Sequence, residues 1–286
     1  MRLIFVHGIR QEGKPQETLK DNWEGALRNA WTALGIPIPA FELVMPYYGD
    51  ELDALTREVR GPSAAVIARG GAPAAAYSAG EVEMLRQLAK RAGATDADIR
   101  QELGQAVVAR GPANWEWVQG IARWLSRNAP WLSEFALDFV RQVDAYLDRP
   151  HIQQAVDAIV GPALREGPSV VVAHSLGSIV SYRLLRRYGT DASVKLFVTL
   201  GSPLGIDVVK ARLKPPRLKV PDGVERWLHG ADERDYVALE AALNARTFAA
   251  DIENLTDIHN SQADPHSIWD YLSDPRIAKR IAETLR

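Results

Sequence analysis

The sequence predicts an α/β protein built on a mostly parallel, doubly wound sheet. The first observation behind this prediction is that short apolar, β-branched stretches alternate along the chain with amphipathic stretches of helical spacing. The second is that one apolar stretch runs directly into a serine framed by small residues, which is typical of a strand, a sharp turn and a helix. The chain has 286 residues, 47% of them hydrophobic, so it can bury the core of one large domain or of a domain with an insertion.

The N-terminal residues supply the first strands of this sheet. A strand is expected over residues 3–6, and the apolar stretch ends at Gly8, which permits a tight turn. Leucine, alanine and tryptophan then repeat at helical spacing over residues 19–34, and Gly35 ends this helix. Residues 41–48 are expected to form the second strand.

A helical stretch follows that is too long for an ordinary connection between a strand and a helix. Helical spacing predicts helices over residues 81–92, 114–128 and 132–146, and Pro130 separates the last two. Three charged residues of the last of these helices are expected to point outward: Glu134, Asp138 and Arg141.

We interpret residues 50–150 as a helical cap inserted into an α/β core that consists of residues 1–49 and 151–286. A glycine- and alanine-rich stretch, residues 61–79, is expected to be a flexible connector within the cap. The tryptophans of the cap are expected to pack it onto the core, because the polar helix faces carry charges of both signs. An apolar pocket for acyl chains or a lid that touches a membrane is the alternative.

The second half of the chain supplies the remaining strands. One strand is expected to end just before Ser175, and a helix follows at once. Further strands are predicted over residues 194–200, 226–230 and 247–250. The basic segment 210–219 is expected to be a solvated loop, because it is short and broken by prolines.

Ser175 is the candidate nucleophile of this chain. It lies between Ala173 and Gly177, and we expect both positions to be small because the sharp bend presses them together. The helix that begins beneath the serine presents free N–H groups and a partial positive charge where an oxyanion would form. One oxyanion donor is expected from the N–H of Leu176, and the other from the N–H of Ile9 after the first strand.

A nucleophilic serine needs a base, and in this architecture the base follows along the chain. Three histidines lie after Ser175. His229 is expected to pack inside a strand, whereas His259 and His266 share a loop before the final helix. We favour His266, because the helix that directly follows would hold it rigidly.

The base in turn needs a carboxylate that orients it. We favour Asp235, because Tyr236 and Val237 can pack and hold it toward the histidine loop. Asp232, in the same loop, is the alternative acid.

Together these segments resemble the α/β-hydrolase superfamily, and more closely its bacterial lipase-like or serine-esterase-like branch. The resemblance rests on five segments that span almost the whole chain: residues 5–8, 173–177, 201–205, 232–237 and 265–267. It implies an α/β-hydrolase fold that lacks the first two strands of the family, and it supports Asp235, His266 and, in the final helix, Tyr271. The sequence departs from the usual motif at Ala173, where glycine is more common.

Composition argues against several other classes of function. The net charge of −2 gives no electrostatic basis for binding nucleic acid or an anionic membrane. The chain has no cysteine, and its histidines and carboxylates lack metal-ligand spacing, so we expect neither a metal nor a cofactor. No apolar stretch is long enough for a signal peptide or a membrane span, and we therefore expect a cytoplasmic protein. The sequence does not indicate an oligomeric state.

The sequence therefore predicts a serine hydrolase that cleaves a small-molecule ester or other acyl substrate, including a lipid or a thioester. Ser175, Asp235 and His266 would carry the reaction. A peptidase or amidase that uses the same residues is the first alternative. A non-catalytic scaffold, in which this fold serves as a binding module, is the second.

Overall fold

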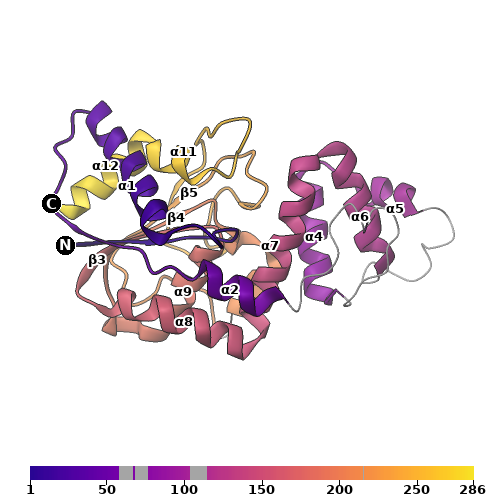
Figure 1. Cartoon of the computed structure of the whole chain (residues 1–286), viewed down its shortest axis with the longest axis horizontal. Coiled ribbons are helices and arrows are strands. Elements are labelled where there is room, and N and C mark those ends of the chain that lie inside the picture. The colour runs from indigo at the N-terminus through magenta and orange to yellow at the C-terminus, as the bar shows by residue number, and fades with distance from the viewer. Residues whose placement is uncertain (58–66, 68–76, 104–114, 215) are drawn as a thin grey trace. The chain divides into compact units, whose positions relative to one another are not determined.

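The computed structural model describes residues 1–57, 67, 77–103, 115–214 and 216–286 (Figure 1). The chain divides into two compact units. Met1–Asp53 and Gln154–Arg286 form the first, which we call the sheet unit, and Ala54–Gln153 form the second, which we call the helical unit. Whether the helical unit acts as a cap stays a prediction.

The sheet unit contains one sheet of six strands, all parallel, in the order β2-β1-β3-β4-β5-β6. The strands are β1 (Arg2–Val6), β2 (Glu42–Val44), β3 (Pro168–His174), β4 (Ser193–Leu200), β5 (Trp227–Gly230) and β6 (Glu253–Leu255). The prediction of an α/β protein with a parallel sheet is therefore confirmed, whereas the hydrolase fold in particular stays a prediction.

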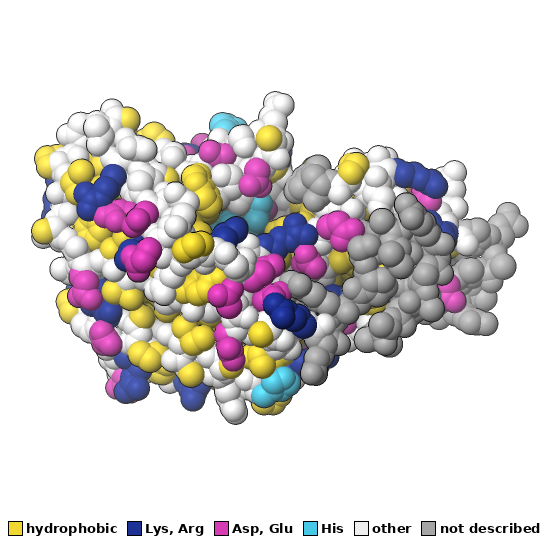
Figure 2. Space-filling view, viewed as in Figure 1, with side chains coloured by type: hydrophobic (Ala, Val, Ile, Leu, Met, Phe, Trp, Pro, Cys, Tyr) yellow, Lys and Arg dark blue, Asp and Glu magenta, His cyan; other side chains and the backbone are white. Residues whose placement is uncertain are grey.

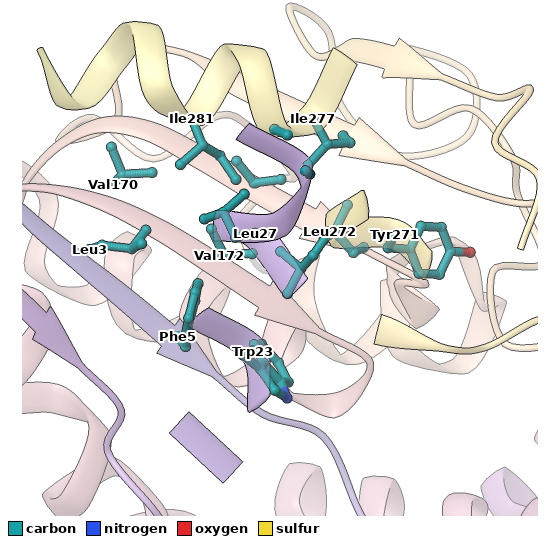
Figure 3. Packing of buried hydrophobic residues seen from close by; sticks show 14 of the residues in the cluster. Leu3, Phe5, Trp23, Leu27, Val170, Val172, Tyr271, Leu272, Ile277 and Ile281 are labelled. Carbon is teal, nitrogen blue, oxygen red and sulfur yellow. The ribbon is translucent and has the colours of Figure 1, made fainter. Parts of the chain in front are cut away.

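Three helices cover one face of the sheet: α1 (Gln16–Ala33), α11 (Ile268–Ser273) and α12 (Pro275–Leu285). Alternate strand residues such as Phe5 and Val172 meet Trp23 of α1 and Ile281 of α12 in one apolar cluster (Figure 3). A hydrogen bond also joins two of these helices, since Trp31 Nε1 of α1 donates to the carbonyl of Ala278 of α12 at 2.7 Å.

The opposite face of the sheet carries α9 (Leu176–Tyr188) and α8 (Pro150–Arg165) (Figure 1). On this face Tyr182 of α9 contacts Trp227 of β5, with 5.5 Å between the ring centroids. Arg183 of α9 forms an ion pair of 2.6 Å with Asp157 of α8. Helices on both faces explain why the central strands are apolar without alternation.

Shorter elements connect these layers: α2 (Gly49–Thr56), α10 (Asp207–Leu213) and the 3₁₀ helices η3 (Gly189–Asp191) and η4 (Pro203–Gly205). The basic segment 210–219 is therefore a loop only in part, because its first residues belong to α10. The amphipathic order of these residues, with Val209 and Leu213 buried, accounts for the helix.

The predicted position of the sixth strand is wrong. Residues 247–250 form turns, and the strand that pairs with β5 is β6. Phe248 is apolar because it packs edge-on against Tyr182 and Trp227, at centroid distances of 5.0 and 5.9 Å. The second strand is also shorter than expected, since Pro46 has no N–H to donate to a ladder.

The described residues of the helical unit include the helices α4 (Ala79–Arg91), α5 (Asp96–Leu103), α6 (Trp115–Asn128) and α7 (Pro130–Asp148). A capping box begins α4, in which Ser78 Oγ accepts from Glu81 N at 3.0 Å and Glu81 Oε2 accepts from Ser78 N at 2.6 Å. The prediction for Arg141 is wrong: its side chain is buried, and its guanidinium lies 4.2 Å from the centre of the Tyr77 ring. Most of the expected connector, residues 61–79, lies outside the described residues.

Candidate active site

The strand order reverses at β1 and β3. The chain passes from β1 to β2 on one side, and then returns across β1 to form β3 on the other. In open parallel sheets, such a reversal leaves a gap between the connections, and this gap is where ligands bind. Val6 lies opposite Ala173 in the register of β1 and β3, so Gly8 and Ser175 both follow at this edge.

Ser175 occupies the sharp turn between β3 and α9. Its φ of 53° and ψ of −128° lie in a region that side chains with a Cβ rarely adopt. Such strain costs about 1–3 kcal/mol and persists only where the surrounding structure enforces it. A backbone outlier at the predicted nucleophile therefore supports a functional turn.

Two glycines make room for this turn. A Cβ at Gly8 would lie 2.7 Å from Ser175 Cβ, and a Cβ at Gly177 would lie 2.2 Å from the carbonyl oxygen of Val6. The backbone at the end of β1 thus leaves no space for a side chain at Gly177, whereas the motif suggested that Ala173 would do so. This difference explains how alanine is accommodated at position 173.

The hydroxyl of Ser175 is buried and forms no hydrogen bond with any part of the chain that the structure describes. The backbone N–H and carbonyl of Ser175, by contrast, both form hydrogen bonds. Ser175 N donates to the carbonyl of Leu200 at 3.2 Å, and Ser178 N donates to the carbonyl of Ser175 at 3.0 Å. The backbone of the serine is therefore held in place while its Oγ has no fixed partner within this part of the chain.

His266 and Asp235 lie in direct contact. Nδ1 of His266 donates to Oδ2 of Asp235 at 2.8 Å, and Asp235 is fully buried. The other oxygen, Oδ1, accepts from the backbone N–H of Val237 at 2.9 Å and of Ala238 at 3.4 Å. Tyr271 of α11 donates its hydroxyl to Oδ2 at 2.8 Å.

These donors determine the charge state of Asp235. Burial by itself raises the pKa of this carboxyl, but the charge and hydrogen bond of His266, with the bonds from Tyr271 and Val237, outweigh burial. The pKa of Asp235 therefore lies below its ordinary value, and the group is a carboxylate near neutral pH.

His174, the residue before Ser175, holds the loop that carries His266. Its Nε2 donates to the carbonyl of His266 at 3.0 Å, and the two imidazole rings lie 4.4 Å apart, measured between centroids. Burial, followed by the nearby charge of His266, lowers the pKa of His174 well below its ordinary value. His174 is therefore neutral, and it contacts His266 without competing for a proton.

Gly201 connects the serine turn with the Asp235–His266 pair. It follows Leu200, whose carbonyl accepts from Ser175 N, and it has a φ of 52°. A Cβ at this position would lie 2.7 Å from Asp235 Oδ2 and 2.9 Å from His266 Nδ1. The end of β4 thus lies between the serine turn and the pair.

Asp232, the alternative acid, bonds to different partners. Its carboxylate accepts from Arg234 at 2.7 Å and from the backbone N–H of Asn260 at 2.6 Å. These bonds tie the loop after β5 to the loop that leads to His266. Of the two acids, the structure places Asp235 and not Asp232 on the histidine.

The other two histidines lie apart from this contact. His259 is exposed, and His229 is buried in β5, where its Nδ1 lies 3.1 Å from the Thr199 hydroxyl. The interpretation of His229 as a core residue agrees with this position. Burial lowers its pKa to about 4, so it is neutral near neutral pH.

The expected oxyanion donors, Ile9 and Leu176, follow β1 and β3. Leu176 is the first residue of α9, so its N–H has no partner within the helix. His7 fixes the peptide before Ile9: its Nδ1 donates to the carbonyl of Gly8 at 2.8 Å, and its Nε2 accepts from Tyr48 N at 3.1 Å. In a trans peptide the N–H of Ile9 points away from that carbonyl.

Sequence reasoning placed His7, His174 and Gly201 within the segments that carry the family resemblance, but it gave their side chains or conformation no role in the site. Gly201 could have been found, because it follows a strand directly at the same edge as Ser175. Tyr48 was not singled out as a site residue, and its contact with His7 is not visible in the sequence. The roles of these residues became visible only from the contacts described above.

Surface charge, metal-ligating side chains and helix hydrophobicity bear on whether the protein could bind nucleic acid, a metal ion or a membrane. Acidic and basic side chains are interspersed on the face in view in Figure 2, and neither sign forms a large field there. Across the described residues, no group of three or more histidines or carboxylates is arranged to hold a metal ion. None of the helices in those residues is long and apolar enough to cross a membrane.

Comparisons with known proteins give no relative: no protein-family model, no curated protein and no solved structure matches the chain. The assignment of a function therefore depends on the site itself.

Proposed function

We propose that the protein is a serine hydrolase of the α/β-hydrolase fold that cleaves carboxylic esters, including lipid esters or thioesters. The observation that carries the proposal is the 2.8 Å contact between His266 Nδ1 and the buried Asp235, at the same sheet edge as the strained turn of Ser175. A serine, a histidine and a carboxylate in these roles form the acyl-transfer arrangement of serine hydrolases.

In the proposed reaction, Ser175 Oγ attacks the ester carbonyl carbon while its proton passes to His266 Nε2. The N–H groups of Ile9 and Leu176 stabilise the oxyanion that forms. The tetrahedral intermediate collapses, the alcohol leaves with the proton from His266, and an acyl-enzyme remains. Water then attacks the acyl carbon, again with His266 as the base, and the acid is released.

Asp235 has two tasks in this scheme. Its bond to Nδ1 keeps that nitrogen protonated, so that the unprotonated nitrogen is Nε2, which acts as the base. Its carboxylate also stabilises the imidazolium that forms when the serine loses its proton. The low pKa of Asp235 supports both tasks, because the group stays charged at the pH where the histidine works.

The helical unit is proposed to act as the cap of the active site. In the chain it is inserted between β2 and β3, after the carboxyl end of β2. An insertion at this place in the chain is suited to control the size of the acyl group that reaches Ser175.

A fluorophosphonate probe tests the nucleophile. We expect covalent labelling confined to the Ser175 peptide, and loss of both the label and ester turnover in Ser175→Ala, by about three to six orders of magnitude in rate. Ser273→Ala is the matched control, because Ser273 is an exposed serine of α11. A chromogenic panel of esters and amides then separates an esterase from an amidase.

Two results would contradict the proposal. The first is a folded protein that takes up no label, which would favour a binding module. The second is a Ser175→Ala variant that turns over esters at the rate of the wild type.

A further inference from the structure

The Oδ2 atom of Asp235 accepts two hydrogen bonds from one short segment of the chain. His266 Nδ1 and the Tyr271 hydroxyl both lie 2.8 Å from it. The segment is stiffened between the two donors, because Ser267 caps α11 by accepting from Asp270 N at 3.3 Å. The two donors therefore reach Asp235 as one preformed pair.

The proton of the Tyr271 hydroxyl has a fixed direction. The backbone N–H of Asp232 donates to this hydroxyl at 2.9 Å, so its oxygen is already an acceptor there. The single hydroxyl proton then points to Asp235. Tyr271 is buried, and burial, followed by the charge of Asp235, raises its pKa well above the ordinary value, so the hydroxyl keeps this proton.

We infer that Tyr271 is a positioning residue that sets the pH at which His266 can accept the serine proton, by sharing the negative charge of Asp235 Oδ2. This inference rests on the proposed serine-hydrolase function. A carboxylate that gives up part of its charge to a second donor holds an imidazolium less strongly. Tyr271 thus keeps His266 unprotonated to a lower pH than Asp235 alone would.

Apart from Tyr271, the titratable groups around Asp235 and His266 are either uncharged near neutral pH or unchanged when the Tyr271 hydroxyl is removed. His7 after β1, His174 at the end of β3 and His229 in β5 are buried, and burial lowers the pKa of each, so they carry no charge near neutral pH. Asp232, in the loop after β5, is paired with Arg234 at 2.7 Å, and Glu233 lies beside it in the same loop. Asp264, in the loop before α11, accepts from the backbone N–H of His266 at 3.2 Å. These groups are the same in a variant that lacks only the Tyr271 hydroxyl.

Tyr271→Phe removes the hydroxyl and keeps the ring. We expect the acid limb of the pH profile of kcat/KM to move upward by about 0.5 to 1 pH unit, because Asp235 then holds protonated His266 more strongly. The titration of the His266 imidazole, followed by NMR in a Ser175→Ala background, should move in the same direction. That readout needs no substrate and no turnover.

Tyr182→Phe is the matched control. The Tyr182 ring is also buried, and its hydroxyl also bonds to backbone groups, donating to Lys219 O at 3.1 Å and accepting from Lys219 N at 3.2 Å. Loss of the Tyr182 hydroxyl should lower the free energy of unfolding to a similar extent as loss of the Tyr271 hydroxyl. It should not move the acid limb of the pH profile or the His266 titration. A pH profile of Tyr271→Phe that superimposes on that of Tyr182→Phe would overturn the inference.

3-Fluorotyrosine at position 271 provides a variant that keeps both hydrogen bonds. Its hydroxyl is a stronger donor, so the His266 titration should move downward, opposite to Tyr271→Phe. A shift in the same direction as Tyr271→Phe, or none, would contradict the inference. Absence of Ser175-dependent turnover together with the two opposite NMR shifts would refute the proposed function and leave the coupling of Tyr271 to His266 established.

Discussion

Gly201 has the strictest requirement for the absence of a side chain near the Asp235–His266 pair. Its φ of 52° suits glycine, and a Cβ would lie within 3 Å of both partners. We expect Gly201→Ala to lower kcat/KM by about 100-fold, since a displacement of about 1 Å in a catalytic group has an effect of this size. Steady-state kinetics on an ester substrate measures the change.

Gly167 provides the control for this substitution. It has a similar φ of 60°, but a Cβ there would meet no atom within 4 Å. Gly167→Ala should therefore lower the free energy of unfolding by about 1–2 kcal/mol and leave kcat/KM unchanged. Equal losses of activity in the two variants would mean that backbone strain, and not crowding of the pair, is responsible.

At the scale of single residues, the sequence singles out one candidate nucleophile, Ser175, but it favours Asp235 as the acid while leaving Asp232 as an alternative. The turn at the serine is encoded locally, in a β-branched strand, small residues and a helix that follow one another. Asp232 and Asp235 lie in one loop, and which of them reaches His266 depends on how that loop folds. Asp232 instead binds Arg234 and Asn260, and it thereby joins this loop to the loop before α11.

Among the helices, α12 contributes to the stability of the fold through a stripe of buried apolar side chains. Ile281 is fully buried in the cluster with Val172 and Leu27 (Figure 3). Lys279 of the same helix is exposed. We expect Ile281→Ala to lower the free energy of unfolding by about 2–5 kcal/mol, because it leaves a cavity in the core. Denaturant unfolding gives this value.

Lys279→Ala tests whether this loss reflects packing or helix propensity. Both substitutions introduce alanine into α12, but the exposed one should change the free energy of unfolding by no more than about 0.5 kcal/mol. A large effect of Lys279→Ala would show that the charge on the outer face of α12 matters more than the cavity.

Secondary structure was predictable where a helix or strand is encoded by its own periodicity. The stripe of α1 and the central strands are of this kind, because burial on one or both faces fixes their pattern. The sixth strand was misplaced because Phe248 is apolar for packing on α9 and β5, a contact that local sequence does not show. Arg141 was wrongly expected to point outward, because the ring that it packs against belongs to Tyr77, which lies far from it in the sequence.

For the whole molecule, buried histidines predict sensitivity to acid. Burial lowers the pKa of His7 and of His229 to about 4, and that of His174 is also well below its ordinary value. An unfolded histidine titrates near 6.5, so between about pH 6.5 and 4 the unfolded chain binds more protons than the folded one. The free energy of unfolding should therefore fall as the pH falls through this window, by up to about 3 kcal/mol for each histidine.

Urea unfolding at several pH values between 7.5 and 4.5 checks this expectation. His229→Gln should make the pH dependence shallower, and the exposed His259 should make no difference when replaced by glutamine. The depressed pKa of Asp235 acts in a separate window, because its contribution to stability is present above about pH 4 and is lost only below it. Identical pH dependence in the wild type and in His229→Gln would contradict the assignment.

The architecture of the sheet was predictable because alternation of strands and helices leaves few parallel arrangements. The fold family was inferred from short motifs, and it stays a prediction. The contacts that give the site its chemistry join residues far apart in sequence, such as Asp235 with His266 and His7 with Tyr48. Their pairing depends on the assembled sheet, and a local pattern does not encode it.

The place of the helical unit in the chain has a consequence for synthesis on the ribosome. β1 is an interior strand, but β3, its neighbour on one side, begins at Pro168, long after β2 ends at Val44. At about 5–20 residues per second, the ribosome needs on the order of ten seconds to make the intervening chain. Throughout that time the nascent protein exposes an apolar strand edge, so chaperone capture during translation should act first on the N-terminal residues.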